Sequence, residues 1–128
     1  RGLIMVTGAT GNGKSTTIAS LLEHINQKLP KHIVTLEDPI EYVFQDNIAS
    51  FSQREVGRDV DSIQQGLEGA LREDPDVLFV GECRTLNEFE VALHAAPTSS
   101  APSRAWSPCS QTSGRTRRAI AWQTYCRP

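Results

Sequence analysis

The sequence predicts an α/β fold in which helices cover a parallel sheet. Three short apolar runs, at residues 3–7, 32–36 and 77–80, are typical of buried strands. Helical periods of apolar residues alternate with these runs, and this alternation implies right-handed crossovers and parallel pairing. The first run leads directly into a glycine-rich segment, which is typical of sheets that carry a phosphate-binding loop.

The glycine-rich segment fits the pattern GxxxxGK[ST], in which backbone amides close around phosphate oxygens. Its members are Gly8, Ala9, Thr10, Gly11, Asn12, Gly13, Lys14 and Ser15. The three glycines supply the positive φ angles that so tight a turn requires. We expect Lys14 to contact the β- and γ-phosphates of a nucleoside triphosphate, Ser15 to bind Mg²⁺, and Thr16 to bond the α-phosphate.

A helix is predicted after the loop, over residues 15–29, and a strand over residues 32–36. The helix has an apolar stripe formed by Ile18, Leu21, Leu22, Ile25 and Leu29. Pro30 ends the helix, and the strand ends in an acidic cluster at residues 37–41. Open α/β sheets bind ligands at the carboxyl ends of their strands, so this cluster is placed to act on a metal ion or on water.

Residues 42–60 have no clean period, and we expect an irregular or hairpin excursion there. Asp61 and Gln64 resemble a capping box, which predicts the start of a second helix. Its apolar positions end near Arg72, and Pro75 separates it from the next strand.

The apolar strand at residues 77–80 delivers Gly81 and Glu82 to the same edge of the sheet, in the manner of a Walker B motif. Thr85 and Glu88 then predict a second capping box and a third helix. The apolar face of that helix is formed by Leu86, Phe89, Leu93 and Ala96.

Length and composition limit the classes of protein. The 128 residues give room for one domain, whereas nucleotide-hydrolysing domains of this type need about twice that length. The sequence has no apolar run of about eighteen residues, so a cytoplasmic protein is expected. The cysteines at positions 83, 109 and 126 lack CxxC spacing, and we expect reduced thiols with neither a disulfide framework nor a cysteine metal site.

Charge and composition divide the chain near residue 96. Residues 1–96 hold 8 Lys or Arg and 15 Asp or Glu, a net charge of −7, whereas residues 97–128 hold 5 Arg and no acid, a net charge of +5. The basic segment has no amphipathic period, and nucleic-acid binding is not indicated. It also lacks Leu, Val, Phe and Met, so we expect a disordered tail that forms no core strand.

Three segments in register resemble the secretion ATPase superfamily: TLEDPIE at residues 35–41, QREVG at 53–57 and ALREDPDVLFVGE at 70–82. Over residues 2–96 the chain looks most like the type IV pilus retraction ATPases, the twitching motility PilT group. The QREVG segment favours this group over the pilus-assembly and type II secretion ATPases. The resemblance implies that residues 1–96 form a partial RecA-like ATPase domain, truncated relative to the family, followed by an irregular tail.

The resemblance also implies an activity. The family forms cytoplasmic hexamers that act with the pilus machinery at the inner face of the bacterial inner membrane, and they use ATP and Mg²⁺ to power pilus retraction and twitching motility. In this chain Glu37 would orient or deprotonate the attacking water, and Glu82 would support Mg²⁺ or that water. Arg54, Arg58 and Arg72 are candidate subunit-interface charges, and a surface ion pair is an equal alternative for each.

The chain departs from the family pattern in three places. The family's GE[IM]RD is GECRT at residues 81–85, and neither the PAS-like amino-terminal domain nor the TGH segment and His box is found. The alternatives are a pilus-assembly or type II secretion ATPase fragment, a catalytically dead nucleotide-binding or interaction module, and a small P-loop kinase. We expect weak MgATP binding with negligible turnover, and a three-stranded sheet whose unpaired edge lowers solubility.

A shift of reading frame near Ala96 would explain the tail. When residues 119–126 are back-translated with G or C in most wobble positions and read two bases later, they can yield the sequence DRLADVLP. This is similar to the DRIVDVFP stretch that follows the His box in the family. A genuine basic tail and a deliberately altered sequence are the alternatives.

Overall fold

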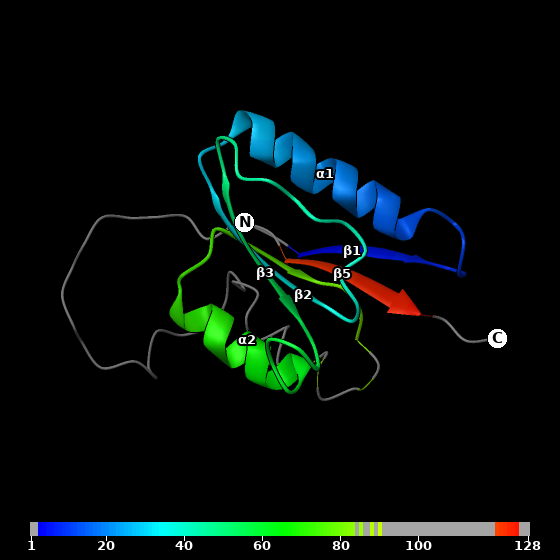
Figure 1. Cartoon of the computed structure of the whole chain (residues 1–128). Helices are drawn as coiled ribbons and strands as arrows, with labels where there is room; N and C mark the ends of the chain where they lie inside the picture. Colours follow the sequence, from blue (N-terminus) through cyan, green and yellow to red (C-terminus); the bar gives the residue numbers. More distant parts are fainter. Residues whose placement is uncertain (1–2, 84, 86–87, 89, 91–119, 126–128) are drawn as a thin grey trace, which may run out of the picture.

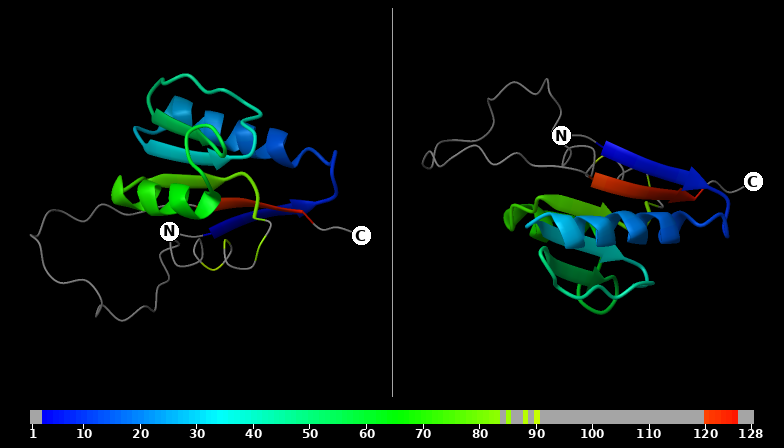
Figure 2. Two further views of the ribbon diagram at one scale, coloured as in Figure 1. Left: turned by 60° about the horizontal axis from the view of Figure 1, so that its bottom comes forward. Right: turned by 90° about the horizontal axis from the view of Figure 1, so that it is seen from above.

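The computed structural model of the chain describes residues 3–83, 85, 88, 90 and 120–125. A five-stranded sheet lies at its centre, and all neighbouring strands are parallel. The elements in chain order are β1 (Leu3–Gly8), α1 (Lys14–Lys28), β2 (His32–Glu37), β3 (Ser50–Glu55), α2 (Ile63–Arg72), β4 (Val77–Val80) and β5 (Ile120–Tyr125). The strand order across the sheet is β1-β5-β4-β2-β3, and the two helices cover opposite faces (Figure 1, Figure 2).

The predicted α/β class and the three predicted strands are confirmed. Parallel strands need long connections, and α1 lies in the connection from β1 to β2, whereas α2 lies in the connection from β3 to β4. Because every pair is parallel, all five strands end at one edge of the sheet, which we call the carboxyl edge. The loop after β1, the end of β2 and the segment after β4 all lie at this edge.

The prediction of an irregular or hairpin excursion over residues 42–60 is wrong for residues 50–55. Residues Ser50–Glu55 form β3, which pairs in parallel with β2 in a register that sets Thr35 opposite Gln53 and Glu37 opposite Glu55. The strand lies at the edge of the sheet and has a single apolar residue, Phe51, which stacks on Phe44 with ring centroids 4.7 Å apart. A polar edge strand leaves little hydrophobic period in the sequence, which is why the pattern gave no sign of it.

The expectations of a three-stranded sheet and of a tail that forms no core strand are also wrong. Residues Ile120–Tyr125 form β5 between β1 and β4, with Ile120 in register with both Leu3 and Leu78. Strand pairing is made by backbone groups, and the segment IAWQTY consists largely of residues that favour extended structure. Low apolar content in the tail as a whole therefore did not exclude a strand within it.

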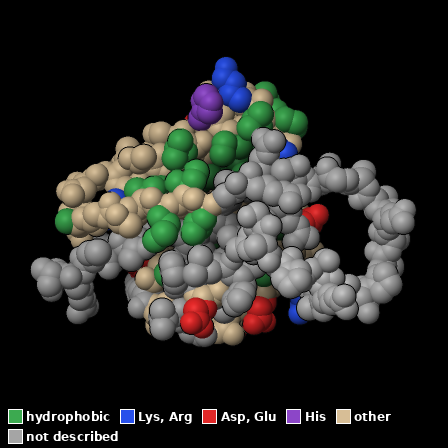
Figure 3. Space-filling model, turned by 180° about the vertical axis from the view of Figure 1, so that it is seen from behind, with side chains coloured by type: hydrophobic (Ala, Val, Ile, Leu, Met, Phe, Trp, Pro, Cys, Tyr) green, Lys and Arg blue, Asp and Glu red, His purple; other side chains and the backbone are tan. Residues whose placement is uncertain are grey.

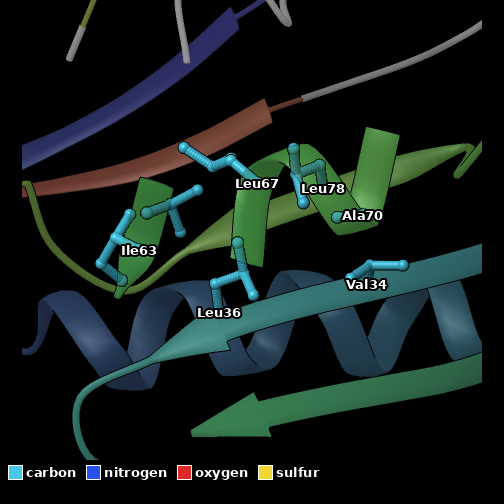
Figure 4. Close-up of a cluster of buried hydrophobic side chains, with 7 residues drawn as sticks. Val34, Leu36, Ile63, Leu67, Ala70 and Leu78 are labelled. Carbon is cyan, nitrogen blue, oxygen red and sulfur yellow. The ribbon is translucent and has the colours of Figure 1, made fainter. Parts of the chain in front are cut away.

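Each face of the sheet is covered in part by one helix, and each face has its own hydrophobic cluster. The cluster under α2 consists of Val34, Leu36, Ile63, Leu67, Ala70, Leu78 and Val80 (Figure 4). The cluster under α1 consists of Ile18, Leu22, Ile33, Ala49, Val77 and Phe79. Successive residues of a strand point to opposite faces, so the side chain of Glu37 shares the α1 face with Ile33 and Thr35.

The second helix begins one residue later than predicted. Its N-cap is Ser62, whose Oγ accepts a hydrogen bond of 3.2 Å from the backbone N–H of Gln65. The Oε1 atom of Gln65 accepts a bond of 2.9 Å from the backbone N–H of Asp61. The capping pair is therefore Ser62 and Gln65 rather than Asp61 and Gln64. The sequence has two adjacent cap formers, Asp61 and Ser62, and two adjacent glutamines three residues later, so the capping-box pattern fits equally well at either of two neighbouring positions.

The predicted capping box of the third helix is confirmed. The backbone N–H of Thr85 donates to Glu88 Oε2 at 3.1 Å, and the backbone N–H of Glu88 donates to Thr85 Oγ1 at 3.3 Å. The residues predicted to form its apolar face, Leu86, Phe89, Leu93 and Ala96, lie outside the described residues.

Apolar side chains gather on the back of the molecule, along β1 and α1 (Figure 3). The exposed large apolar residues of the described chain include Ile4 and Met5 of β1, Leu21 of α1 and Leu29 just beyond it. Among the described strands, β1 and β3 are the edge strands of the sheet. Within the described part of the chain, no helix combines the length and the apolar character needed to cross a membrane.

Candidate functional site

The glycine-rich loop joins β1 to α1 at the carboxyl edge. Gly11 (φ 84°) and Gly13 (φ 74°) have left-handed backbone conformations, which a residue with a side chain adopts only with strain. Gly13 is the N-cap of α1 and provides no side-chain cap, so the first amides of the helix are not capped by its side chain. A glycine-rich loop that ends at the start of a helix is a geometry suited to binding an anion, and the phosphate site stays a prediction.

The polar side chains of the loop and first helical turn lie at this anion site. Lys14 is 5% exposed, and its Nζ donates a hydrogen bond of 2.9 Å to the backbone carbonyl of Ala9, across the loop. Ser15 is half-buried beside it. Thr16 Oγ1 lies 3.2 Å from the hydroxyl of Tyr42, which belongs to the segment after β2. The cationic and hydroxyl groups that a triphosphate with Mg²⁺ requires are thus on one short stretch of backbone.

The pairing of β2 with β4 places Glu37 and Glu82 at the ends of neighbouring strands, at the carboxyl edge. Leu36 lies opposite Val80, and the backbone N–H of Gly81 donates to the Leu36 carbonyl at 2.7 Å. A Cβ atom on Gly81 would lie 3.3 Å from Glu37 Cα and 3.4 Å from the Leu36 carbonyl oxygen, so the two strand ends approach as closely as they do because residue 81 is glycine. One carboxylate oxygen of Glu82, Oε1, is buried.

Glu37 is 6% exposed, and its carboxyl group is held by neighbours on its own and the adjacent strand. Its Oε1 accepts a hydrogen bond of 2.8 Å from Thr35 Oγ1 and a longer one of 3.4 Å from Gln53 Nε2. Burial raises the pKa of Glu37, while the bonds from Thr35, Gln53 and the backbone of Glu41 oppose this shift and the charge of Glu41 adds to it. A raised pKa suits a carboxylate that accepts a proton from water near neutral pH.

The three candidate arginines lie in different places. The Arg54 guanidinium forms an ion pair with Glu73, whose other oxygen is 3.6 Å from His32 Nε2 at the start of β2. The charged end of Arg54 therefore points away from the carboxyl edge, and the ion-pair alternative holds for it. Arg72 ends α2 and is exposed beside Glu73, whereas Arg58 is exposed in the turn after β3, at the carboxyl edge.

Sequence reasoning placed Gly81 at this sheet edge without a role of its own and missed Gln53 and Tyr42. Gly81 sets the approach of the strand ends, Gln53 contacts Glu37, and Tyr42 contacts Thr16. Gln53 was visible as part of QREVG, but its contact depends on a parallel register between strands that the sequence pattern did not show.

The departure at Thr85 has a structural explanation, because threonine serves as a helix N-cap there, a role that the family's aspartate also fills well.

A phosphate loop after the first strand of a parallel sheet, with acidic residues at neighbouring strand ends, defines the class: a P-loop nucleotide-binding protein with a RecA-like α/β core. Residues 1–101 match the model of a family described as "Type II/IV secretion system protein". This match covers most of the 128 residues, and the chain belongs to that family.

The chain is 50% identical over 98 residues to the type IV pilus retraction ATPase PilT of Pseudomonas aeruginosa, which covers 77% of the chain and 28% of that protein. It is 49% identical over 98 residues to a twitching motility protein of Neisseria gonorrhoeae, over 77% of the chain and 26% of that protein. Its structure is similar to a crystal structure of the pilus retraction motor PilT with bound ADP, with a TM-score of 0.79 and 46% identity over 98% of the chain and 31% of the motor. The chain thus spans less than a third of the length of each.

Proposed function

We propose that the chain is part of an ATP-driven motor for type IV pilus retraction and twitching motility, and that it carries the ATP-binding and hydrolytic site. The observation that carries this proposal is the placement of the phosphate loop, Glu37 and Glu82 at the same edge of one parallel sheet. The similarity to PilT specifies the motor, because a P-loop alone fits many nucleotide-binding proteins.

In this proposal the loop amides and Lys14 hold the β- and γ-phosphates, and Thr16 holds the α-phosphate. Bound Mg²⁺ would be held by Ser15 and Glu82 and would neutralise charge on the phosphates. Glu37, buried and with a raised pKa, orients the attacking water and accepts its proton. Phosphoryl transfer depends mainly on positioning and charge compensation, which these fixed groups supply.

The assembly is proposed from the resemblance. We infer a hexamer at the cytoplasmic face of the inner membrane that works with the pilus machinery and not with nucleic acid. Of the three candidate arginines, Arg58 is the best placed to act across a subunit interface, because it is exposed at the carboxyl edge. The Arg54 guanidinium is engaged with Glu73 on the opposite side, so we expect it to support the fold.

Binding of MgATP to the chain tests the nucleotide site. Lys14→Ala removes a charged hydrogen-bond donor worth about 1.5–3 kcal/mol, which corresponds to a loss of affinity of about 10- to 100-fold. Lys28→Ala is the matched control, since it removes the same charge from the exposed last residue of the same helix. Equal affinities for the two variants would contradict the proposal.

The proposed role of Glu37 is tested in the full-length motor. We expect Glu37→Gln to leave MgATP binding intact and to abolish both hydrolysis and twitching motility. Unchanged motility would favour the catalytically dead interaction module instead. Loss of protein secretion with motility intact would favour the type II secretion reading, and phosphate transfer to a small acceptor would favour a kinase.

A further inference from the structure

The segment that follows β2 contacts both the phosphate-loop helix and the catalytic carboxylate. Residues 42–44, which we call the strap, are held by the side-chain amide of Gln53 from β3. Its Nε2 donates to the Tyr42 carbonyl at 2.8 Å, and its Oε1 accepts from the backbone N–H of Phe44 at 2.8 Å. The same Nε2 donates to Glu37 Oε1 at 3.4 Å.

These bonds fix the orientation of the Gln53 amide. Its oxygen must face the Phe44 N–H, so its NH₂ group necessarily faces the strap carbonyl and the carboxylate. A displacement of the strap therefore moves one of the two side-chain hydrogen-bond donors of Glu37, the other being Thr35 on β2 itself. On the far side, the segment beyond the strap is anchored by Asn26 of α1, which is 2% exposed and whose Nδ2 donates to the Gln45 carbonyl at 2.8 Å.

The other end of this connection is the Tyr42 hydroxyl, 3.2 Å from Thr16 Oγ1. A threonine hydroxyl has one proton and two acceptor lone pairs. If Tyr42 donates to it, the proton of Thr16 stays directed toward an anion in the loop. Occupation of the loop then changes the bond between Thr16 and Tyr42, and with it the position of the strap.

We propose that Tyr42 and Gln53 are positioning residues. Through the strap, they couple binding of an anion in the phosphate loop at Thr16 to the position and hydrogen bonding of the Glu37 carboxylate. The inference deepens the proposed function, since it rests on the same nucleotide site. Neither residue is required to touch a reacting atom. Their contribution is to make the carboxylate respond to whether nucleotide is bound.

Nuclear magnetic resonance of the side-chain amide groups tests the coupling without nucleotide. The Gln53 amide signal is assigned by its loss in Gln53→Met. We expect Thr16→Val to shift this signal, whereas Thr17→Val, the matched control, leaves it in place because the Thr17 hydroxyl bonds to the Gly13 carbonyl instead. The Gln45 amide signal serves as an internal reference. A Gln53 signal that is unmoved by Thr16→Val would overturn the coupling.

A second experiment adds MgATP. We expect it to shift the Gln53 amide signal in the wild-type chain, and Tyr42→Phe to lower the affinity about 2- to 10-fold, the worth of one hydrogen bond. At saturating MgATP the shift is lost in Tyr42→Phe, and an equal shift in both chains would overturn the inference. If wild type and Lys14→Ala both fail to bind MgATP, the proposed function fails instead, and the Thr16→Val result still decides the coupling.

Discussion

Gly66 lies where α2 packs most closely on the sheet, and replacing it tests that packing. A Cβ atom at this position would lie 2.7 Å from Leu36 Cδ2, 3.3 Å from Leu36 Cδ1 and 3.4 Å from Val60 Cγ2. Leu36 is fully buried in the cluster under α2, so its methyl groups have no space into which to move. Gly66→Ala is therefore expected to overpack the core, at a cost of about 1–3 kcal/mol.

The second glycine of α2 provides the matched control. A Cβ atom on Gly69 would meet only Arg54 Nη1, at 3.2 Å, and a guanidinium end that is partly exposed can shift aside. Both substitutions gain about 0.8–1 kcal/mol from helix propensity, so this gain cancels when the two variants are compared. We expect Gly69→Ala to be more stable than Gly66→Ala by about 1–3 kcal/mol, which is the overpacking term alone.

Urea unfolding followed by circular dichroism measures this difference. The slope of the free energy of unfolding against urea should be the same in both variants, because neither changes the surface exposed on unfolding. If Gly66→Ala proves as stable as Gly69→Ala or more stable, the close approach of α2 to β2 is wrong. Leu36 precedes Glu37, so the same result would also weaken the geometry assigned to the site.

Three further predictions follow from single residues. Burial raises the pKa of Glu37 from its ordinary value of 4.5, so the folded chain binds this proton more tightly than the unfolded chain. The wild type should therefore lose stability relative to Glu37→Gln as the pH rises through the raised pKa. Urea unfolding at a series of pH values measures this loss. Burial, with the charges of Glu88 and Glu82, raises the pKa of Cys83 to about 12. Iodoacetamide at pH ~8 should therefore alkylate Cys83 far more slowly in the folded chain than in urea. Mass spectrometry of the peptide that contains Cys83 measures the two rates. Ser62→Ala should lower the stability by about 0.5–2 kcal/mol through loss of the α2 cap, whereas Ser52→Ala, in the edge strand β3, should change it less.

Local signals in the sequence predicted the parts of the site that depend on one segment at a time. The glycines of the loop and the carboxylates at the ends of β2 and β4 are examples, because strand ends and turn glycines are set by neighbouring residues. Gln53 is different, since its contact with Glu37 needs the parallel register of β3 on β2. The ion pair of Arg54 with Glu73 likewise joins β3 to the residue after α2, and no local pattern distinguished it from an interface charge.

The strand β5 lies beyond the residues that match the family's sequence model. The family model ends at residue 101, close to the break in composition near Ala96, whereas β5 begins at Ile120. Its position between β1 and β4 satisfies backbone groups of both neighbours, and backbone pairing places few demands on the residues that supply it. The strand is therefore compatible with a shifted reading frame. Sequencing the coding DNA from the Ala96 codon onward in all three frames decides the matter: a TGH segment, a His box and DRLADVLP in another frame would confirm the shift, and their absence would make the basic tail native.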